Sequence, residues 1–127
     1  MSRFLLRIEG KQRVRASDGR VRPEALQCFH YAEVPGLSIV WWPPIEGDPW
    51  PRYTITHKAS GARVGPHTYT TLEEAEDALA RVAGLFDWSL AGFALREAFD
   101  ARALQDRAFI ERVTFALNPI QRSESAA

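Results

Sequence analysis

The chain has 127 residues, of which 46% are hydrophobic and 25% are charged, and its formal net charge at pH 7 is zero. This length and balance predict one domain over 1–119 and a disordered tail over 120–127. A single cysteine excludes an internal disulfide, and the absence of an apolar run of ~20 residues excludes a membrane span. The N-terminus also lacks the features of a signal peptide, so we expect a cytoplasmic protein.

The first expected elements are two strands over 3–9 and 11–16, joined by a hairpin turn at Gly10–Lys11. Residues 1–22 hold seven of the sixteen basic residues but two of the sixteen acidic ones. The hairpin would gather four arginines on its outer face, namely Arg3, Arg7, Arg13 and Arg15. This basic surface is interpreted either as a solvated face or as a contact surface for nucleic acid.

The next two expected strands span 27–34 and 37–42 and are separated by a turn at Pro35–Gly36. In the first of them, alternation places Phe29 and Tyr31 on one face and Cys28 and His30 on the other. The second is apolar on both faces apart from Ser38, which predicts a central position in the sheet.

A stiff loop is predicted over 43–51, because four of its nine residues are proline. Trp41 and Trp42 precede this loop and Trp50 lies within it. Neighbouring strand residues point to opposite faces, so Trp41 and Trp42 cannot both face the same helix layer. Trp50 has no obvious position in a core.

A strand over 52–58, a turn at Ser60–Gly61 and a short return strand over 62–64 lead to an amphipathic helix. Thr71 followed by Glu74 predicts the start of that helix through a capping box. Its apolar face comprises Leu72, Ala75, Leu79, Val82 and Phe86, and its polar face comprises Glu73, Glu76, Asp77 and Arg81. The expected fold is therefore α+β, an antiparallel sheet of four to five strands with two to three helices on one face.

The last expected helix spans 90–117 and ends before Asn118–Pro119. If it is continuous, Phe93, Leu104 and Phe115 form a second apolar stripe, well separated from the first. A second stripe predicts a second packing partner, either another part of the chain or another molecule. A break near Asp100 is the alternative, and it would remove this inference.

Nucleophilic catalysis would need Cys28 or a serine activated by a histidine, and a metal site would need Cys28, His30, His57 and His67. Their spacing matches no zinc pattern, and Cys28 and His30 are expected to stand side by side without pointing at each other. The chain also has no nucleophile elbow and no glycine-rich phosphate loop. We therefore expect no enzymatic activity, no metal and no cofactor.

Binding to a protein partner is the preferred function, through aromatic and aliphatic residues typical of interface hot spots. The predicted contact residues are Trp41, Trp42, Trp50, Phe93, Leu104 and Phe115. A homodimer could use the same helix residues. The alternative is nucleic-acid binding through Arg3, Arg7, Arg13, Arg15, Arg52 and Arg63.

The segment 53–88 contains a Thr-His pair, a Ser-Gly turn, a T-x-E-E-A helix start and an Asp-Trp end. In this order of motifs it resembles small accessory proteins of phages and other mobile elements of high-GC bacteria. The resemblance implies a protein that binds host or element machinery, as a modulator or inhibitor. The strand–turn–strand–helix order is also similar to the DNA-reading arm domains of integrases, for which Arg52 and Arg63 fit but Thr54 and Thr56 do not.

Overall fold

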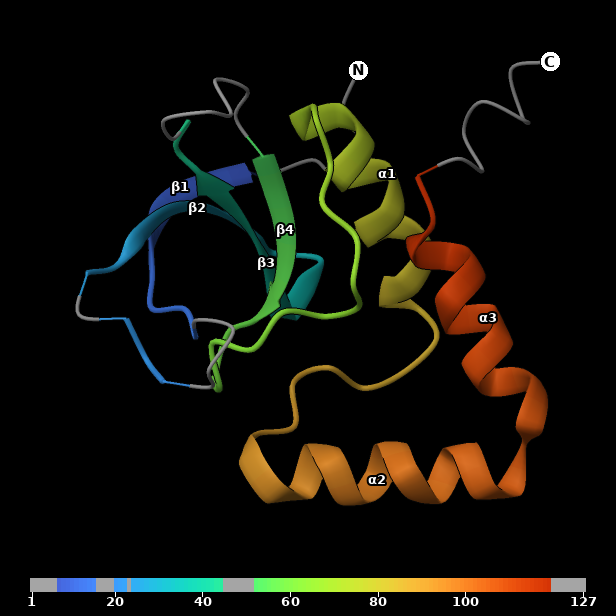
Figure 1. The fold of residues 1–127 in the computed structure, drawn as a ribbon. Helices are drawn as coiled ribbons and strands as arrows, with labels where there is room; N and C mark the ends of the chain where they lie inside the picture. Colours follow the sequence, from blue (N-terminus) through green and yellow to red (C-terminus); the bar gives the residue numbers. More distant parts are fainter. Residues whose placement is uncertain (1–6, 16–19, 23, 45–51, 120–127) are drawn as a thin grey trace, which may run out of the picture.

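The computed structural model describes residues 7–15, 20–22, 24–44 and 52–119. In chain order its elements are β1 (Arg7–Gln12), β2 (Leu26–Tyr31), β3 (Val34–Trp42), β4 (Arg52–His57), α1 (Leu72–Ala83), α2 (Gly92–Gln105) and α3 (Arg107–Leu117). The strands form one antiparallel sheet in the order β1-β2-β3-β4 (Figure 1). The expected α+β class is confirmed, with four strands and three helices. No helix in these described ranges is long and apolar enough to cross a membrane.

The predicted N-terminal hairpin is wrong, because β1 runs without a turn through Gly10 and Lys11. Gly10 is paired with Cys28 across the β1–β2 ladder. A Cβ atom at Gly10 would lie 3.0 Å from the imidazole ring of His30. The glycine therefore makes room for a side chain of the neighbouring strand. Residue 3 and the expected tail over 120–127 lie outside the described residues.

The turn between β2 and β3 also differs from the prediction, since it falls at Ala32–Glu33 while Pro35 and Gly36 belong to β3. A Cβ atom at Gly36 would lie 1.9 Å from the carbonyl oxygen of Trp88. The strand therefore needs glycine at this position, because the backbone of the segment after α1 occupies the space where a side chain would lie.

The sheet is strongly curved, and the segment after β1 meets the turn after β4 (Figure 1). The Arg15 N–H donates to the Gly61 carbonyl at 3.0 Å, and the Gln12 side-chain amide donates to the Lys58 carbonyl at 3.0 Å. The inner face of the curve holds a small second core of Val14, Cys28 and Val40, with Leu26 and Trp42 packed against it. Curvature thus gives the sheet two buried faces.

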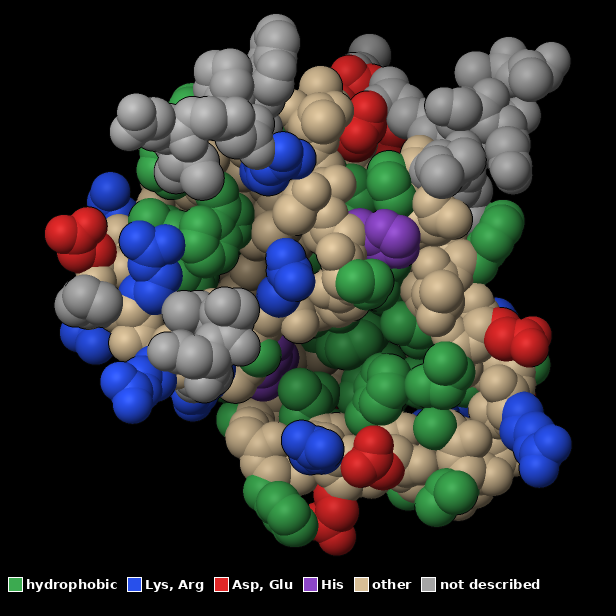
Figure 2. Space-filling model, viewed as in Figure 1, with side chains coloured by type: hydrophobic (Ala, Val, Ile, Leu, Met, Phe, Trp, Pro, Cys, Tyr) green, Lys and Arg blue, Asp and Glu red, His purple; other side chains and the backbone are tan. Residues whose placement is uncertain are grey.

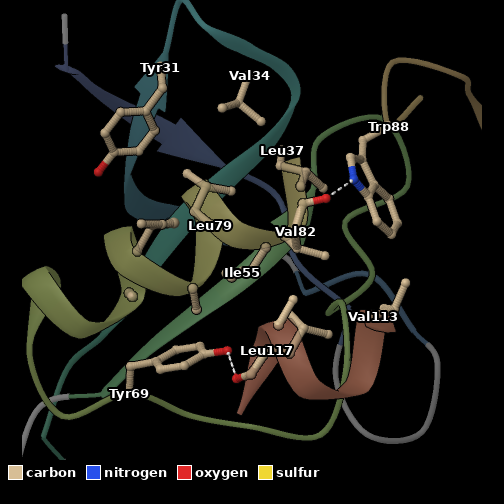
Figure 3. Packing of buried hydrophobic residues seen from close by; sticks show 14 of the residues in the cluster. Tyr31, Val34, Leu37, Ile55, Tyr69, Leu79, Val82, Trp88, Val113 and Leu117 are labelled. Atoms are coloured by element: carbon tan, nitrogen blue, oxygen red, sulfur yellow. Dashed lines mark hydrogen bonds between the residues drawn. The ribbon is translucent and has the colours of Figure 1, made fainter. Parts of the chain in front are cut away.

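The main core lies between the opposite face of the sheet and the helices (Figure 3). Two buried hydrogen bonds join its elements. The Trp88 indole N–H donates to the carbonyl of Val82 at 3.0 Å, and the Tyr69 hydroxyl donates to the carbonyl of Leu117 at 2.5 Å. These bonds attach the segments on either side of α1 to α1 itself and to the end of α3.

Helix α1 begins as predicted, with the Thr71 hydroxyl accepting a hydrogen bond from the Glu74 N–H at 3.1 Å. Two residues assigned to its polar face form hydrogen bonds with other elements of the fold. Glu76 is 3% exposed and accepts hydrogen bonds from Tyr31 at 2.5 Å and from Arg7 at 3.1 Å. Arg81 donates to the carbonyl of Ala116, at the C-terminus of α3. Both contacts come from distant elements, which helical periodicity does not reveal.

The expected continuous helix over 90–117 is wrong, because the chain leaves helical geometry at Asp106, six residues beyond the break considered at Asp100. Asp106 ends α2 and caps α3, where its carboxylate accepts from the Ala108 N–H at 3.1 Å. The two helices consequently run in different directions, and in Figure 1 α3 rises from the right-hand end of the horizontal α2. The inference from one continuous second stripe no longer applies.

Candidate binding surfaces

A cavity of about 420 Å³ opens between α2, α3 and residues 60–67. Figure 2 shows hydrophobic side chains gathered in this hollow, above α2. The apolar lining includes Val64, Trp88, Leu95, Phe99, Ile110 and Val113. A cavity of this volume and lining is typical of binding sites for small apolar ligands.

The segment 60–67 forms one wall of the cavity because it pairs with the edge of β4. The Val64 N–H donates to the Ile55 carbonyl at 2.8 Å, and Arg63 forms an antiparallel bridge with Thr56. Gly65 then has φ of +78°, and a Cβ atom there would lie 2.8 Å from a methyl group of Leu117. Glycine at this position allows the wall to turn and approach α3 closely.

The inner end of the cavity is held by an aromatic cluster. Phe99 makes edge contacts with Phe86 and Phe109, with ring centroids 5.4 and 5.1 Å apart, and Phe86 contacts Trp88 at 5.3 Å. Edge-to-face aromatic pairs are favourable beyond their burial. The Trp88 and Phe99 rings that line the cavity are therefore held in place by contacts with other aromatic rings.

His57 and Ser60 also line the cavity, and their contact was not predicted from the sequence. The His57 Nε2–H donates to the Leu90 carbonyl at 2.7 Å, and Nδ1 is hydrogen-bonded to the Ser60 hydroxyl at 2.8 Å. The Ser60 oxygen in turn accepts from the Ala62 N–H at 3.2 Å. A hydroxyl hydrogen-bonded to an imidazole can act as a nucleophile. Here the hydrogen bonds of His57 to Ser60 and to the Leu90 carbonyl also connect the turn after β4 to the segment before α2. The signal in the sequence was a serine three residues after a histidine at a turn.

The rim of the cavity carries charge. Arg63 and His67 lie on the β4-edge side, and Arg96 and Asp100 lie on α2. Arg96 and Asp100 form an exposed ion pair at 4.0 Å. Arg63 is exposed, and the structure shows no side-chain partner for it among the described residues.

The three predicted contact residues on the helices are exposed, even though they lie on two helices and not on one continuous helix. Phe93 and Leu104 on α2 are 78% and 87% exposed, and Phe115 on α3 is 59% exposed. Leu95 and Phe99 of α2 pack inward against the core. Helix α2 thus presents apolar side chains on both its inner and its outer surface.

The predicted tryptophans are placed differently. Trp42 is half-buried against the second core, its indole N–H donates to the Thr54 hydroxyl at 2.8 Å, and the Arg22 guanidinium lies 5.4 Å over its ring. Trp41 is half-buried and pairs with Tyr53 in the β3–β4 register. Trp50 lies outside the described residues. Trp42 is therefore held by intramolecular contacts, and the contact role of all three remains a prediction.

The predicted arginines are divided between two places. The Arg7 guanidinium bonds Glu76 and lies 5.6 Å over the Phe29 ring. Arg15, in contrast, donates from Nε to the Ser60 carbonyl at 2.9 Å, which brings it to the segment that carries Arg63. Arg13 is exposed in the same stretch, and Arg52 begins β4 opposite Trp42.

Cys28 and His30 point at each other, contrary to the expectation that they only stand side by side: Sγ and Nε2 are 3.1 Å apart. The ring lies over Gly10, which offers no side chain to hold it away. Burial raises the pKa of the Cys28 thiol, although Lys58 and Lys11 oppose the shift. Burial and then the charge of Lys58 lower the pKa of His30. Both shifts disfavour the ionised thiolate–imidazolium form of the pair, which is the form that a nucleophilic cysteine uses.

Within the described ranges, no group of three or more histidine, cysteine, aspartate or glutamate residues is placed to hold a metal ion. Cys28 and His30 lie on the inner face of the sheet, whereas His57 and His67 line the cavity. The four candidate ligands are consequently divided between two regions.

Comparison of the chain with models of protein families, with curated proteins and with solved structures found no match.

Proposed function

We propose that this chain is a small, non-enzymatic binding protein that docks onto a protein partner through the outer surface of α2. The observation that carries the proposal is the exposure of Phe93 and Leu104, 78% and 87%, on a helix that buries no residue. Large apolar side chains exposed together mark interaction surfaces. The resemblance of residues 53–88 to accessory proteins of mobile elements suggests that the partner belongs to a larger machine in the cytoplasm.

The inner contacts of α2 do not explain its outer residues. Leu95, Phe99 and Ala103 attach the helix to the main core, and Phe93 and Leu104 could be polar without loss of these contacts. Buried aromatic and aliphatic anchors supply much of the binding free energy at protein interfaces. A partner that covers Phe93 and Leu104 would give them this role.

The test compares wild-type protein with a Phe93→Ser, Leu104→Ser double variant and with a matched Ala94→Ser, Gln105→Ser control on the same helix. Affinity capture from the native host with nuclease treatment identifies partners, and titration of the purified partner measures Kd. The double variant should bind at least about thirty-fold more weakly, corresponding to ~2 kcal/mol. The control should bind like wild type.

Sedimentation of the purified protein alone tests a second copy as the partner, because a homodimer should dissociate in the double variant. Equal Kd values for all three proteins would refute docking through α2. A Trp50→Ala variant, tested in the same titration, would then show whether the predicted tryptophan loop supplies the contact.

Nucleic-acid binding is the second candidate function. Its support is that the Arg15 side chain reaches the turn that precedes Arg63, and that Arg13 and Lys58 lie in the two segments joined there. Phosphate contacts make affinity strongly dependent on salt. Submicromolar binding to duplex DNA at physiological salt, lost in Arg13→Glu, Arg15→Glu, would favour this function over protein docking.

A further inference from the structure

The cavity between α2, α3 and residues 60–67 has the properties of a site for a small ligand, independently of the outer surface of α2. Its volume of about 420 Å³ falls within the range of ~300–1,000 Å³ for such sites. Its aliphatic and aromatic lining comes from four separate parts of the chain, namely residues 60–67, Trp88, α2 and α3, which fix its shape from different sides.

Two polar side chains in the wall, His57 and Ser60, are already hydrogen-bonded. His57 uses both ring nitrogens, on Ser60 and on the Leu90 carbonyl, and Ser60 also accepts from Ala62. A polar group of a ligand placed against this wall would be desolvated without gaining a partner, which costs free energy. The part of the ligand against this wall should therefore be apolar.

The rim, in contrast, selects for negative charge. Arg96 and Asp100 neutralise one another on α2. Arg63 and His67 line the cavity from the β4-edge segment, and no contact of Arg63 with a carboxylate is observed among the described residues. A guanidinium binds a carboxylate through two parallel hydrogen bonds, a geometry that an ammonium group lacks.

We propose that this cavity binds an amphipathic monocarboxylate, with its aliphatic or aromatic body against Trp88, Leu95 and Phe99 and its carboxylate on Arg63. Such a ligand satisfies the apolar wall and the positive rim together. The site uses the inner surface of α2, so it does not require the outer surface proposed for protein docking.

Isothermal titration with decanoate and with decanol, which has the same chain without the charge, tests the proposal. Wild-type protein should bind decanoate at least about tenfold more tightly than decanol, because the charge-assisted contact is made with decanoate alone. Arg63→Gln should remove this difference and leave decanol binding unchanged. Arg13→Gln, an exposed arginine that does not line the cavity, should behave like wild type.

Two further variants locate the site. Thr114→Trp places a large ring at the cavity mouth and should abolish binding of both ligands while the melting temperature stays near that of wild type. Phe93→Ser, Leu104→Ser should bind decanoate as wild type does, which separates this site from the docking surface. The proposal is overturned if wild type binds neither ligand, if decanol binds as tightly as decanoate, or if Arg63→Gln retains the preference.

Discussion

Helices α1 and α2 have similar lengths but opposite relations to the rest of the molecule. Helix α1 buries Ala75, Ala78, Leu79 and Val82 and is capped by Thr71. Helix α2 buries no residue and begins at Ala91, which provides no side-chain cap. Both contain large apolar residues, so composition alone does not separate them.

The difference shows which apolar residues serve folding. In α1 they share one face and meet the sheet, where burial contributes to stability. In α2 they are divided between an inner surface, where Leu95 and Phe99 pack against the core and line the cavity, and an outer surface, where Phe93 and Leu104 are exposed to solvent. Only the exposed residues Phe93 and Leu104 are therefore left for the proposed docking surface.

The largest expected effect compares a leucine from each helix. Leu79→Ala should lower the free energy of unfolding by about 2–5 kcal/mol, because it creates a cavity in the main core. Leu104→Ala should change it by less than about 0.5 kcal/mol. Urea denaturation monitored by circular dichroism measures both. Similar losses for the two variants would mean that α2 contributes to folding as α1 does.

A smaller effect is expected at the two helix starts. Thr71→Ala should destabilise the protein by about 0.5–2 kcal/mol through loss of the cap. Thr71→Ser should keep most of the wild-type stability, because serine also caps helices. Ala91 has the extended backbone that a cap requires, so Ala91→Ser should stabilise α2 by up to about 1 kcal/mol. The same denaturation experiment applies, and a destabilising Ala91→Ser would show that the start of α2 is constrained by other contacts.

The smallest expected effect is a loss of stability at acidic pH, when Asp106 becomes protonated. The hydrogen bond from Arg112, followed by its charge, holds the pKa of this carboxyl below its ordinary value of 3.8, against a partial opposing effect of desolvation. Its contribution to stability is therefore present above about pH 3.8 and is lost as the pH falls through the lower folded-state pKa. Amide hydrogen exchange should show the α2–α3 junction opening in acid while α1 remains protected.

Asp106→Asn is the matched variant, because asparagine also caps helices but carries no charge. It should keep the cap at neutral pH and lose the acid dependence at the junction. An unchanged acid response in Asp106→Asn would assign the effect to other carboxylates.

Local sequence signals predicted α1 well because they all agree. The capping residues, the 3.6-residue period and the absence of proline point to one helix, and the structure confirms its start at Thr71. The central position of β3 also followed from its apolar character on both faces.

The predictions from sequence are wrong at positions where a contact with a residue distant in the sequence determines which residue fits. Gly10 and Gly36 were interpreted as turn residues, yet both lie within strands because the His30 ring and the Trp88 backbone occupy the space of a side chain. The cavity could not be predicted for the same reason. Its walls depend on the change of direction at Asp106 and on Gly65 approaching Leu117, and neither is visible in local periodicity.

The pairing of residues 62–69 with β4 has a consequence for solubility. An edge strand with free backbone groups can recruit strands from other molecules and start aggregation. Bridges from Arg63 to Thr56 and from Tyr69 to Tyr53 occupy the outer edge of β4 at two points. The segment that forms a wall of the cavity thereby also blocks this edge against intermolecular sheet growth.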